Sequence, residues 1–168
     1  KSLEAQRRTG YLPENAPLYP ELSIQKYLQM IADLRGISRL DQQSRISDAV
    51  RATGLTQRLS QPIGHLSKGF RQRVGIAQAI IHKPQVLILD EPTIGLDPTQ
   101  LVDVRALIRR LARHSTILLS THILSEVEAT CSKVLVLLGG ELRADARLNE
   151  LSESSDVTLV LDPKAPNI

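Results

Sequence analysis

The stretch from Val86 to Thr93 constrains the fold more than any other part of this chain. It reads V-L-I-L-D-E-P-T, four apolar residues in succession followed by two adjacent carboxylates. An apolar run without alternation is typical of a strand covered on both faces in a parallel sheet. We therefore predict a buried strand over 86–89, with Asp90 and Glu91 at its carboxyl end.

The position of the two carboxylates allows two interpretations. In open α/β sheets, ligands bind at the edge formed by the carboxyl ends of the strands. One carboxylate there can hold Mg²⁺ while the other is aimed at a water molecule, an arrangement that suits nucleotide hydrolysis. The alternative is structural, because many strands end in an acidic residue that only caps the following helix. The D-E-P segment alone does not separate these interpretations.

A helix is predicted directly after this strand. Asp97 suits the N-cap, Pro98 the first helical position and Gln100 the third, in imitation of a capping box. The helix is expected to run to about residue 114 and to bury a stripe of apolar side chains at helical spacing, namely Leu101, Val104, Ile108 and Leu111.

A second apolar run, 117–119, ends in Ser120-Thr121-His122. Parallel strands joined by a helix end at the same edge of a sheet. We therefore expect His122 to lie beside Asp90 and Glu91.

Helices are predicted upstream of these strands. Three prolines over 13–20 indicate a loop, and apolar spacing then predicts helices over 24–34 and 41–53, with Ser23 as the first N-cap and Gly54 after the second helix. Ser67 can cap a third helix that Pro84 ends, with Phe70, Val74, Ala77 and Ile81 as its apolar positions.

The downstream part is predicted to hold a helix and a hairpin. A helix over about 125–132 would turn Val127 and Cys131 inward, and a strand over 134–138 would turn at Gly139-Gly140 into 141–143. Residues 157–161 are a candidate for a further strand.

Composition narrows the function classes. With 42% hydrophobic residues the chain can bury an ordinary core, and 2% aromatics argue against base-stacking platforms. The net charge of +3 is spread over interspersed residues, so nucleic-acid binding is not expected.

The single Cys131 excludes an internal disulfide. No apolar run approaches the roughly 20 residues needed to cross a bilayer, and no signal peptide opens the chain. The sequence does not begin with Met, so we expect a missing upstream portion.

Separate segments together resemble the ATP-binding-cassette (ABC) ATPases, in the order and rough spacing of that family, up to about Leu151. The matching segments are G-Y-L-P-E for the Q-loop (10–14), L-S-K-G-F-R-Q-R for the signature motif (66–73), V-L-I-L-D-E-P for Walker B (86–92), G-L-D-P for the D-loop (95–98) and S-T-H for the switch-histidine loop (120–122). The resemblance, strongest to bacterial export-type ABC ATPases, implies a partial P-loop NTPase-like α/β domain, a mostly parallel sheet flanked by helices plus a helical subdomain. It places that domain at 1–151, with the helical subdomain at about 21–83, and the start of a C-terminal extension at 152–168.

The resemblance also implies roles for the residues of the signature motif and D-loop. In the family, the signature motif binds the γ-phosphate of ATP held by the partner subunit, which assigns ATP binding to Ser67, Lys68, Gly69 and Gln72. A hydroxyl and free N–H groups at a helix start suit an anion. Lys68 and Phe70 depart from the commonest form, L-S-G-G-Q. Asp97 would reach across the dimer, although its capping role explains it nearly as well.

The resemblance assigns catalysis and metal binding to residues at the ends of the strands. Asp90 would hold Mg²⁺, Glu91 would act as general base on the attacking water, and His122 would donate to the γ-phosphate. Glu14 stands where most relatives have the Gln that touches Mg²⁺. A carboxylate can coordinate Mg²⁺ but repels phosphate, so Glu14 is either a metal ligand or only a loop residue.

No G-x-x-x-x-G-K-[ST] motif occurs in the sequence, and Lys1-Ser2 lies too close to 10–14 to end one. We therefore expect the C-terminal two-thirds of a nucleotide-binding domain. The parent would hydrolyse ATP as a head-to-tail dimer with a second ATP-binding subunit, bound to a transmembrane partner at the cytoplasmic face of the bacterial inner membrane. Two alternatives stay open: that this chain alone is a non-catalytic fragment, and that the parent is a soluble ABC protein acting on ribosomes or nucleic acid.

Overall fold

A parallel three-stranded sheet organises the first part of the molecule. The computed structural model describes residues 2–148, which divide into two compact units, one ending at Ile123 and the other beginning at Leu124. In the first unit, β1 (Thr9–Leu12), β2 (Val86–Asp90) and β3 (Thr116–Ser120) pair in that order, with Leu12 opposite Leu89 and Asp90 opposite Ser120. The short helix α1 (Ser2–Arg8) precedes β1 directly.

The connection from β1 to β2 forms a helical bundle. It contains α2 (Ile24–Leu34), α3 (Arg39–Thr53) and α4 (Lys68–Ile80), with short 3₁₀ turns η1 (Thr56–Arg58) and η2 (Ile63–His65) between the last two helices. Ser23 and Ser67 cap α2 and α4 as predicted, and Gly54 ends α3 in the left-handed conformation. The helix α3 begins two residues earlier than predicted because Ser38 accepts from the Asp41 backbone N–H and caps it.

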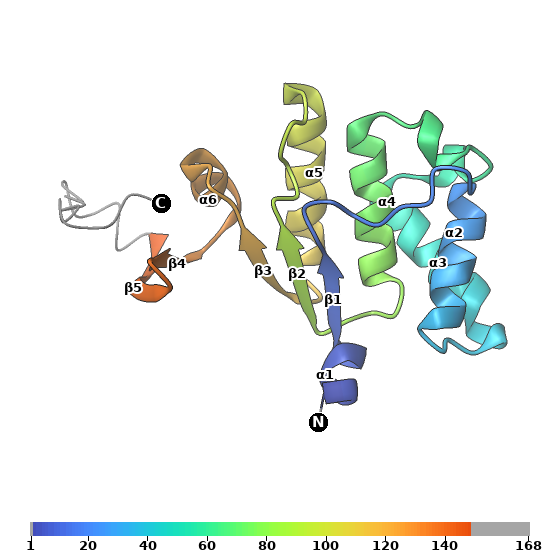
Figure 1. Cartoon of the computed structure of the whole chain (residues 1–168), viewed down its shortest axis with the longest axis horizontal. Helices are drawn as coiled ribbons and strands as arrows, with labels where there is room; N and C mark the ends of the chain where they lie inside the picture. The colour runs from blue at the N-terminus through green and yellow to red at the C-terminus, as the bar shows by residue number, and fades with distance from the viewer. Residues whose placement is uncertain (1, 149–168) are drawn as a thin grey trace. The chain divides into compact units, whose positions relative to one another are not determined.

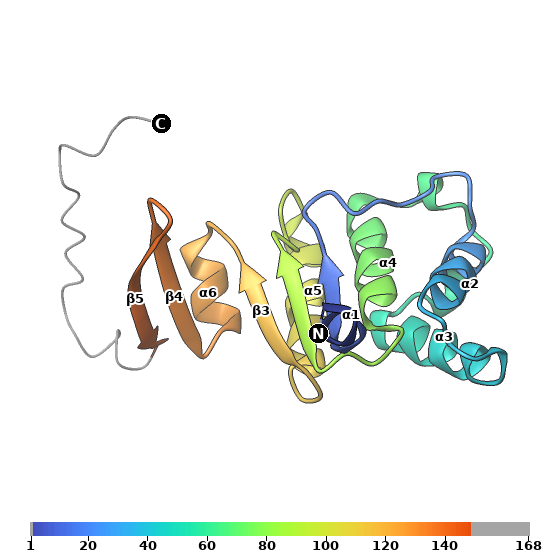
Figure 2. The same ribbon diagram turned by 60° about the horizontal axis from the view of Figure 1, so that its bottom comes forward.

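The helix α4 belongs to two hydrophobic cores. Its Val74 and Ala77 pack with α2 and α3, whereas its Ile76 and Ala79 pack with the sheet and with α5 (Pro98–Leu111). Figures 1 and 2 show α4 between the sheet and the α2–α3 pair. A β-carbon at Gly10 would collide with the Ala79 carbonyl, so this glycine allows β1 to approach α4 closely.

The expectation that β2 is covered on both faces is wrong for this unit. Leu87 and Leu89 are fully buried under α4 and α5, but Val86 is 37% exposed and Ile88 is half-buried. The same alternation exposes Tyr11 on β1 and Leu118 on β3. Within the residues up to Ile123, helices therefore cover one face of the sheet.

The helix α5 begins as predicted and ends earlier. Asp97 accepts from the Gln100 backbone N–H at 2.9 Å and Pro98 is the first helical residue. The helix stops at Leu111, three residues before the predicted end.

The second unit holds α6 (Leu124–Thr130) and an antiparallel hairpin of β4 (Lys133–Leu138) and β5 (Glu141–Arg147). Gly139 and Gly140 form the turn with φ of 60° and 79°, as type I′ hairpin turns require. The helix ends two residues before the predicted limit. Its buried residue is Glu126, whereas Val127 and Cys131 are only half-buried. The strand predicted over 157–161 lies outside the described residues.

Candidate functional site at the carboxyl edge of the sheet

The carboxyl edge of the sheet brings together the acidic pair and the histidine that the sequence singled out. Asp90 is the last residue of β2, and Ser120 is its register partner on β3. The Ser120 hydroxyl donates to Asp90 Oδ1. His122 follows two residues later, and its Nδ1 lies 2.7 Å from Glu91 Oε1. The prediction that Asp90, Glu91 and His122 share one edge is confirmed.

Glu91 is fixed by backbone and side-chain contacts. Its backbone N–H donates to the Ser120 carbonyl at 3.1 Å, and its Oε1 accepts a second hydrogen bond from the His122 backbone N–H at 3.1 Å. Its φ of +46° lies in the left-handed region, which costs a non-glycine residue on the order of 1–3 kcal/mol and recurs at functional sites. The Glu91 carboxylate is thus held in one orientation.

The second oxygen of Glu91 is a buried acceptor without a hydrogen bond. Oε2 has no partner among the described residues, although the Glu91 side chain is only 17% exposed. A buried carboxylate oxygen left unsatisfied is costly in a purely structural site. It suits a site that receives a water molecule or a cation.

The donor set of this edge fits Mg²⁺. Carboxylate and hydroxyl oxygens are the ligands that Mg²⁺ prefers, and Asp90 and Ser120 supply them beside the unsatisfied Glu91 oxygen. Glu14 is exposed in the loop that leaves the same edge two residues after β1. The described residues contain no preformed cluster of three or more His, Cys, Asp or Glu for a metal, so a cation here would need ligands from elsewhere.

The N-terminus of α4 presents Ser67 and Gly69. Ser67 is exposed, and its Oγ accepts from the Phe70 backbone N–H at 3.5 Å, whereas Gly69 is buried. This 13-residue helix directs its positive dipole end toward Ser67.

The other predicted ligands of ATP differ in exposure. Asp97 is exposed and caps α5, and the exposed Lys68 extends its Nζ toward Gly95 of the D-loop. Gln72 is 9% exposed, and its Nε2 has no hydrogen-bond partner among residues 2–148. The ligand contacts of these three side chains stay predictions.

Two residues of the site carry no predicted role in the sequence analysis. Ser120 follows the apolar run of β3, and a hydroxyl at the end of a strand beside Asp90 is a recognisable signal. Gln100 is predicted only as a residue of the capping box, but its side chain reaches Ser67 of α4. No local pattern reveals this second contact, because 33 residues separate the two positions.

Within residues 2–148, every helix is too short or too polar to cross a membrane.

Comparisons with known proteins agree with this arrangement. The family model described as ABC transporter matches residues 1–94. The ABC transporter ATP-binding protein NatA of Bacillus subtilis is 37% identical over 90% of this chain and 62% of its own length. The uncharacterized ABC transporter ATP-binding protein YxlF of the same organism is 35% identical over 91% of this chain and 52% of its own length.

A solved structure described as an ATP-binding subunit of an ABC transporter superposes with a TM-score of 0.74 at 33% identity, over 90% of this chain and 64% of that one. The chain spans about half the length of the curated relatives it matches. The match of the family model over more than half of the chain, together with the geometry of the carboxyl edge, shows that this chain belongs to the ABC transporter family of ATP-binding proteins.

Proposed function

We propose that the protein containing this chain is the ATP-binding and ATP-hydrolysing subunit of an ABC transporter, and that it powers movement of a substrate through a transmembrane partner. The family match and the names of the relatives support the class. The observation that most supports ATP hydrolysis is the 2.7 Å contact between His122 Nδ1 and Glu91 Oε1 at the end of β2.

This contact gives the two residues distinct tasks. In hydrolysis, the oxygen of a water molecule bonds to the γ-phosphorus, the bond from that phosphorus to the bridging oxygen breaks, and ADP and phosphate leave. Glu91 accepts the proton that the water loses, through the oxygen that has no partner in the described structure. His122 holds the other oxygen, so the base keeps its orientation, and the 66% exposure of the His122 side chain supports a contact with the phosphate.

Magnesium fits this edge as a cofactor. Asp90, oriented by the Ser120 hydroxyl, would hold it, and Glu14 is a candidate second ligand. When bound, Mg²⁺ neutralises charge on the β- and γ-phosphates. Asp90 thereby serves binding, and Glu91 stays available as the base.

A second ATP-binding subunit completes the site in this proposal. Ser67, Lys68 and Gly69 at the start of α4 would bind the γ-phosphate of ATP held by that subunit, with Asp97 beside them and Gln72 as a further candidate. Exposure of Ser67, Lys68 and Asp97 supports this role, whereas the burial of Gln72 does not.

The cellular setting follows from the same proposal. The protein would work in the cytoplasm, peripheral to the bacterial inner membrane. We place the nucleotide-binding domain at residues 1–151, with its helical subdomain at about 21–83 and an extension from 152. Because the sequence holds no G-x-x-x-x-G-K-[ST] motif, we further propose that residues 1–168 alone bind MgATP weakly and do not hydrolyse it. Micromolar affinity in a calorimetric titration of this chain would contradict that statement.

Two variants of the full-length protein test the proposed function. His122→Ala should lower the ATPase rate by about 100-fold or more, within the range of an acid–base partner, while ATP still binds. Ser67→Arg should abolish ATP-driven dimerisation, measured by light scattering. The matched controls are His114→Ala and Ser44→Arg, because both residues are exposed and neither belongs to the predicted site.

The outcomes are separable. Unchanged hydrolysis in His122→Ala would remove the Glu91–His122 pair from the chemistry. Normal ATP-driven dimerisation in Ser67→Arg would remove α4 from the phosphate site.

A further inference from the structure

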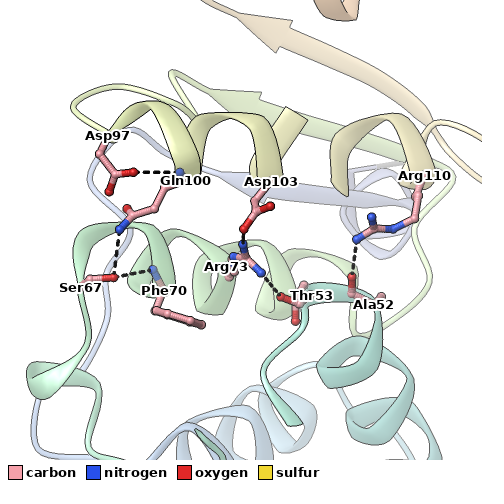
Figure 3. Close-up of polar contacts among 9 residues, drawn as sticks. All are labelled: Ala52, Thr53, Ser67, Phe70, Arg73, Asp97, Gln100, Asp103 and Arg110. Atoms are coloured by element: carbon pink, nitrogen blue, oxygen red, sulfur yellow. Dashed lines mark hydrogen bonds and ion pairs between the residues drawn. The ribbon is translucent and has the colours of Figure 1, made fainter. Parts of the chain in front are cut away.

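The side chain of Gln100 links α5 to the start of α4. Its Nε2 donates to Ser67 Oγ at 3.5 Å (Figure 3). Its carboxamide oxygen lies against Gly69. Its backbone N–H donates to Asp97 Oδ1 at 2.9 Å. One residue therefore contacts both the first turn of α4 and the D-loop aspartate.

The Ser67 Oγ accepts from two donors, each at 3.5 Å. A serine hydroxyl has one donor and two acceptor positions. The Phe70 backbone N–H and the Gln100 Nε2 occupy both acceptor positions. With both acceptor positions used, the O–H proton of the exposed Ser67 stays available for donation to an anion.

The glycine of the signature motif has a steric reason for being present. Gly69 does not have a positive φ, so its backbone conformation does not require glycine. A β-carbon at this position would overlap the Gln100 carboxamide. Because Gly69 has no side chain, the Gln100 carboxamide fits beside it. Any larger residue at this position would push Gln100 away from Ser67.

The side chain of Lys68 also connects α4 with the segment around the start of α5. Lys68 Nζ lies over Gly95, so a β-carbon there would meet the Lys68 ammonium group. Gln100 reaches from α5 to α4, and Lys68 reaches from α4 to the loop before α5. The two predicted cross-subunit elements therefore pack as one unit within a single chain.

We propose that Gln100 is a positioning residue whose side chain aims the Ser67 hydroxyl at the γ-phosphate. The inference rests on the proposed function, because it assumes that Ser67 meets ATP bound to a partner subunit. Gln100 itself does not touch the reacting atoms.

The test is a double-mutant cycle in the full-length protein. Gln100→Met keeps the volume and the helix propensity of the side chain but removes the amide. It should raise the ATP concentration for half-maximal dimerisation about fivefold, as expected for loss of one hydrogen bond. In a Ser67→Ala background the same substitution should have an effect of less than about twofold, because the group that Gln100 orients is already absent.

Gln100→Glu sharpens the result. A carboxylate cannot donate to Ser67 Oγ, accepts a hydrogen bond from the Ser67 hydroxyl in place of the anion and repels phosphate, so it should weaken dimerisation more than Gln100→Met does. Gln43→Met, on the exposed face of α3, is the matched control and should change nothing. The thermal unfolding midpoint of each Gln100 variant should equal that of its own background, because Ser67→Ala by itself removes the N-cap of α4 and lowers the midpoint.

Equal effects of Gln100→Met in the wild-type and Ser67→Ala backgrounds would overturn the inference, as would no effect in either, or a lowered unfolding midpoint that accounts for the loss. Failure of the proposed function looks different: Ser67→Arg would then leave dimerisation intact. A dimerisation loss in Ser67→Arg together with inert Gln100 variants would reject the role of Gln100 alone.

Discussion

The helical bundle and the parallel sheet bury their apolar side chains to different extents. In the bundle, α2, α3 and α4 enclose a core whose members, such as Leu28 and Ile63, are fully buried. The sheet buries one face under α4 and α5 and leaves Tyr11, Val86 and Leu118 between 37% and 51% exposed on the other. The bundle is therefore closed by its own residues, whereas the sheet positions its polar edge with one apolar face open within this unit.

The shared helix α4 connects the two regions. A β-carbon at its Gly75 would lie 2.6 Å from Leu12 Cδ1, so the helix packs tightly on β1. Its opposite side carries Val74 and Ala77 into the bundle core. Displacement of α4 would therefore change both cores and would also move Ser67 at its start.

The largest expected effect comes from opening the closed core. Leu28→Ala should lower the free energy of unfolding by about 2–5 kcal/mol, because a fully buried side chain leaves a cavity. Urea unfolding of the full-length protein followed by circular dichroism measures this change. A loss below about 1 kcal/mol would show that the bundle is not the closed region.

A smaller effect is expected at the polar connection between the regions. Arg73 Nη2 on α4 lies 2.6 Å from Asp103 Oδ2 on α5, and Arg73 Nη1 donates to the Thr53 carbonyl at 3.5 Å (Figure 3). The Arg73 guanidinium also lies over the Phe70 ring, and the Arg73 side chain is 18% exposed. Arg73→Met should cost about 1–3 kcal/mol, since it breaks a largely desolvated network. Asp103→Asn, at the exposed end of the pair, should cost less. Equal costs would assign the stability to the ion pair alone.

A pH effect is expected where α4 meets β1 at the opposite edge. His82 Nε2–H donates to the Thr9 carbonyl at 3.1 Å, and burial, reinforced by the nearby Arg35 charge, lowers the pKa of His82 below its usual value. Because the unfolded chain binds the proton more tightly than the folded one, this contribution to stability is present above about pH 6.5 and is lost as the pH falls toward the folded-state pKa.

His82→Gln should reduce the loss of stability between pH 7 and 5, as measured by thermal unfolding at several pH values. An unchanged pH profile in this variant would assign the titration to another group.

The smallest effect is expected on the open face. Leu118→Thr keeps strand propensity and removes apolar area that is already half exposed, so its cost should stay below about 1 kcal/mol in the same urea experiment. A cost comparable with that of Leu28→Ala would show that another segment covers this face in the full-length protein.

Local signals in the sequence predicted the elements well. Ser23, Ser67 and Asp97 cap helices at the predicted positions because capping depends on residues within one turn. The common edge of Asp90, Glu91 and His122 also followed, since the βαβ rule fixes where parallel strands end.

Other features depend on contacts between distant segments. The open face of the sheet was not predictable from the apolar run 86–89, which looks alike whether one face or both are covered. The buried Glu126 and the contact of Gln100 with Ser67 likewise depend on packing that periodicity does not encode.

The central claim is that the carboxyl edge of the sheet holds the hydrolytic base of an ATPase. Glu91→Gln in the full-length protein tests it most directly, with ATP affinity measured by calorimetry and turnover by phosphate release, and with the exposed Glu128→Gln as control. We predict ATP binding within about threefold of wild type and turnover reduced at least about 100-fold. Turnover equal to that of wild type in Glu91→Gln would contradict the claim.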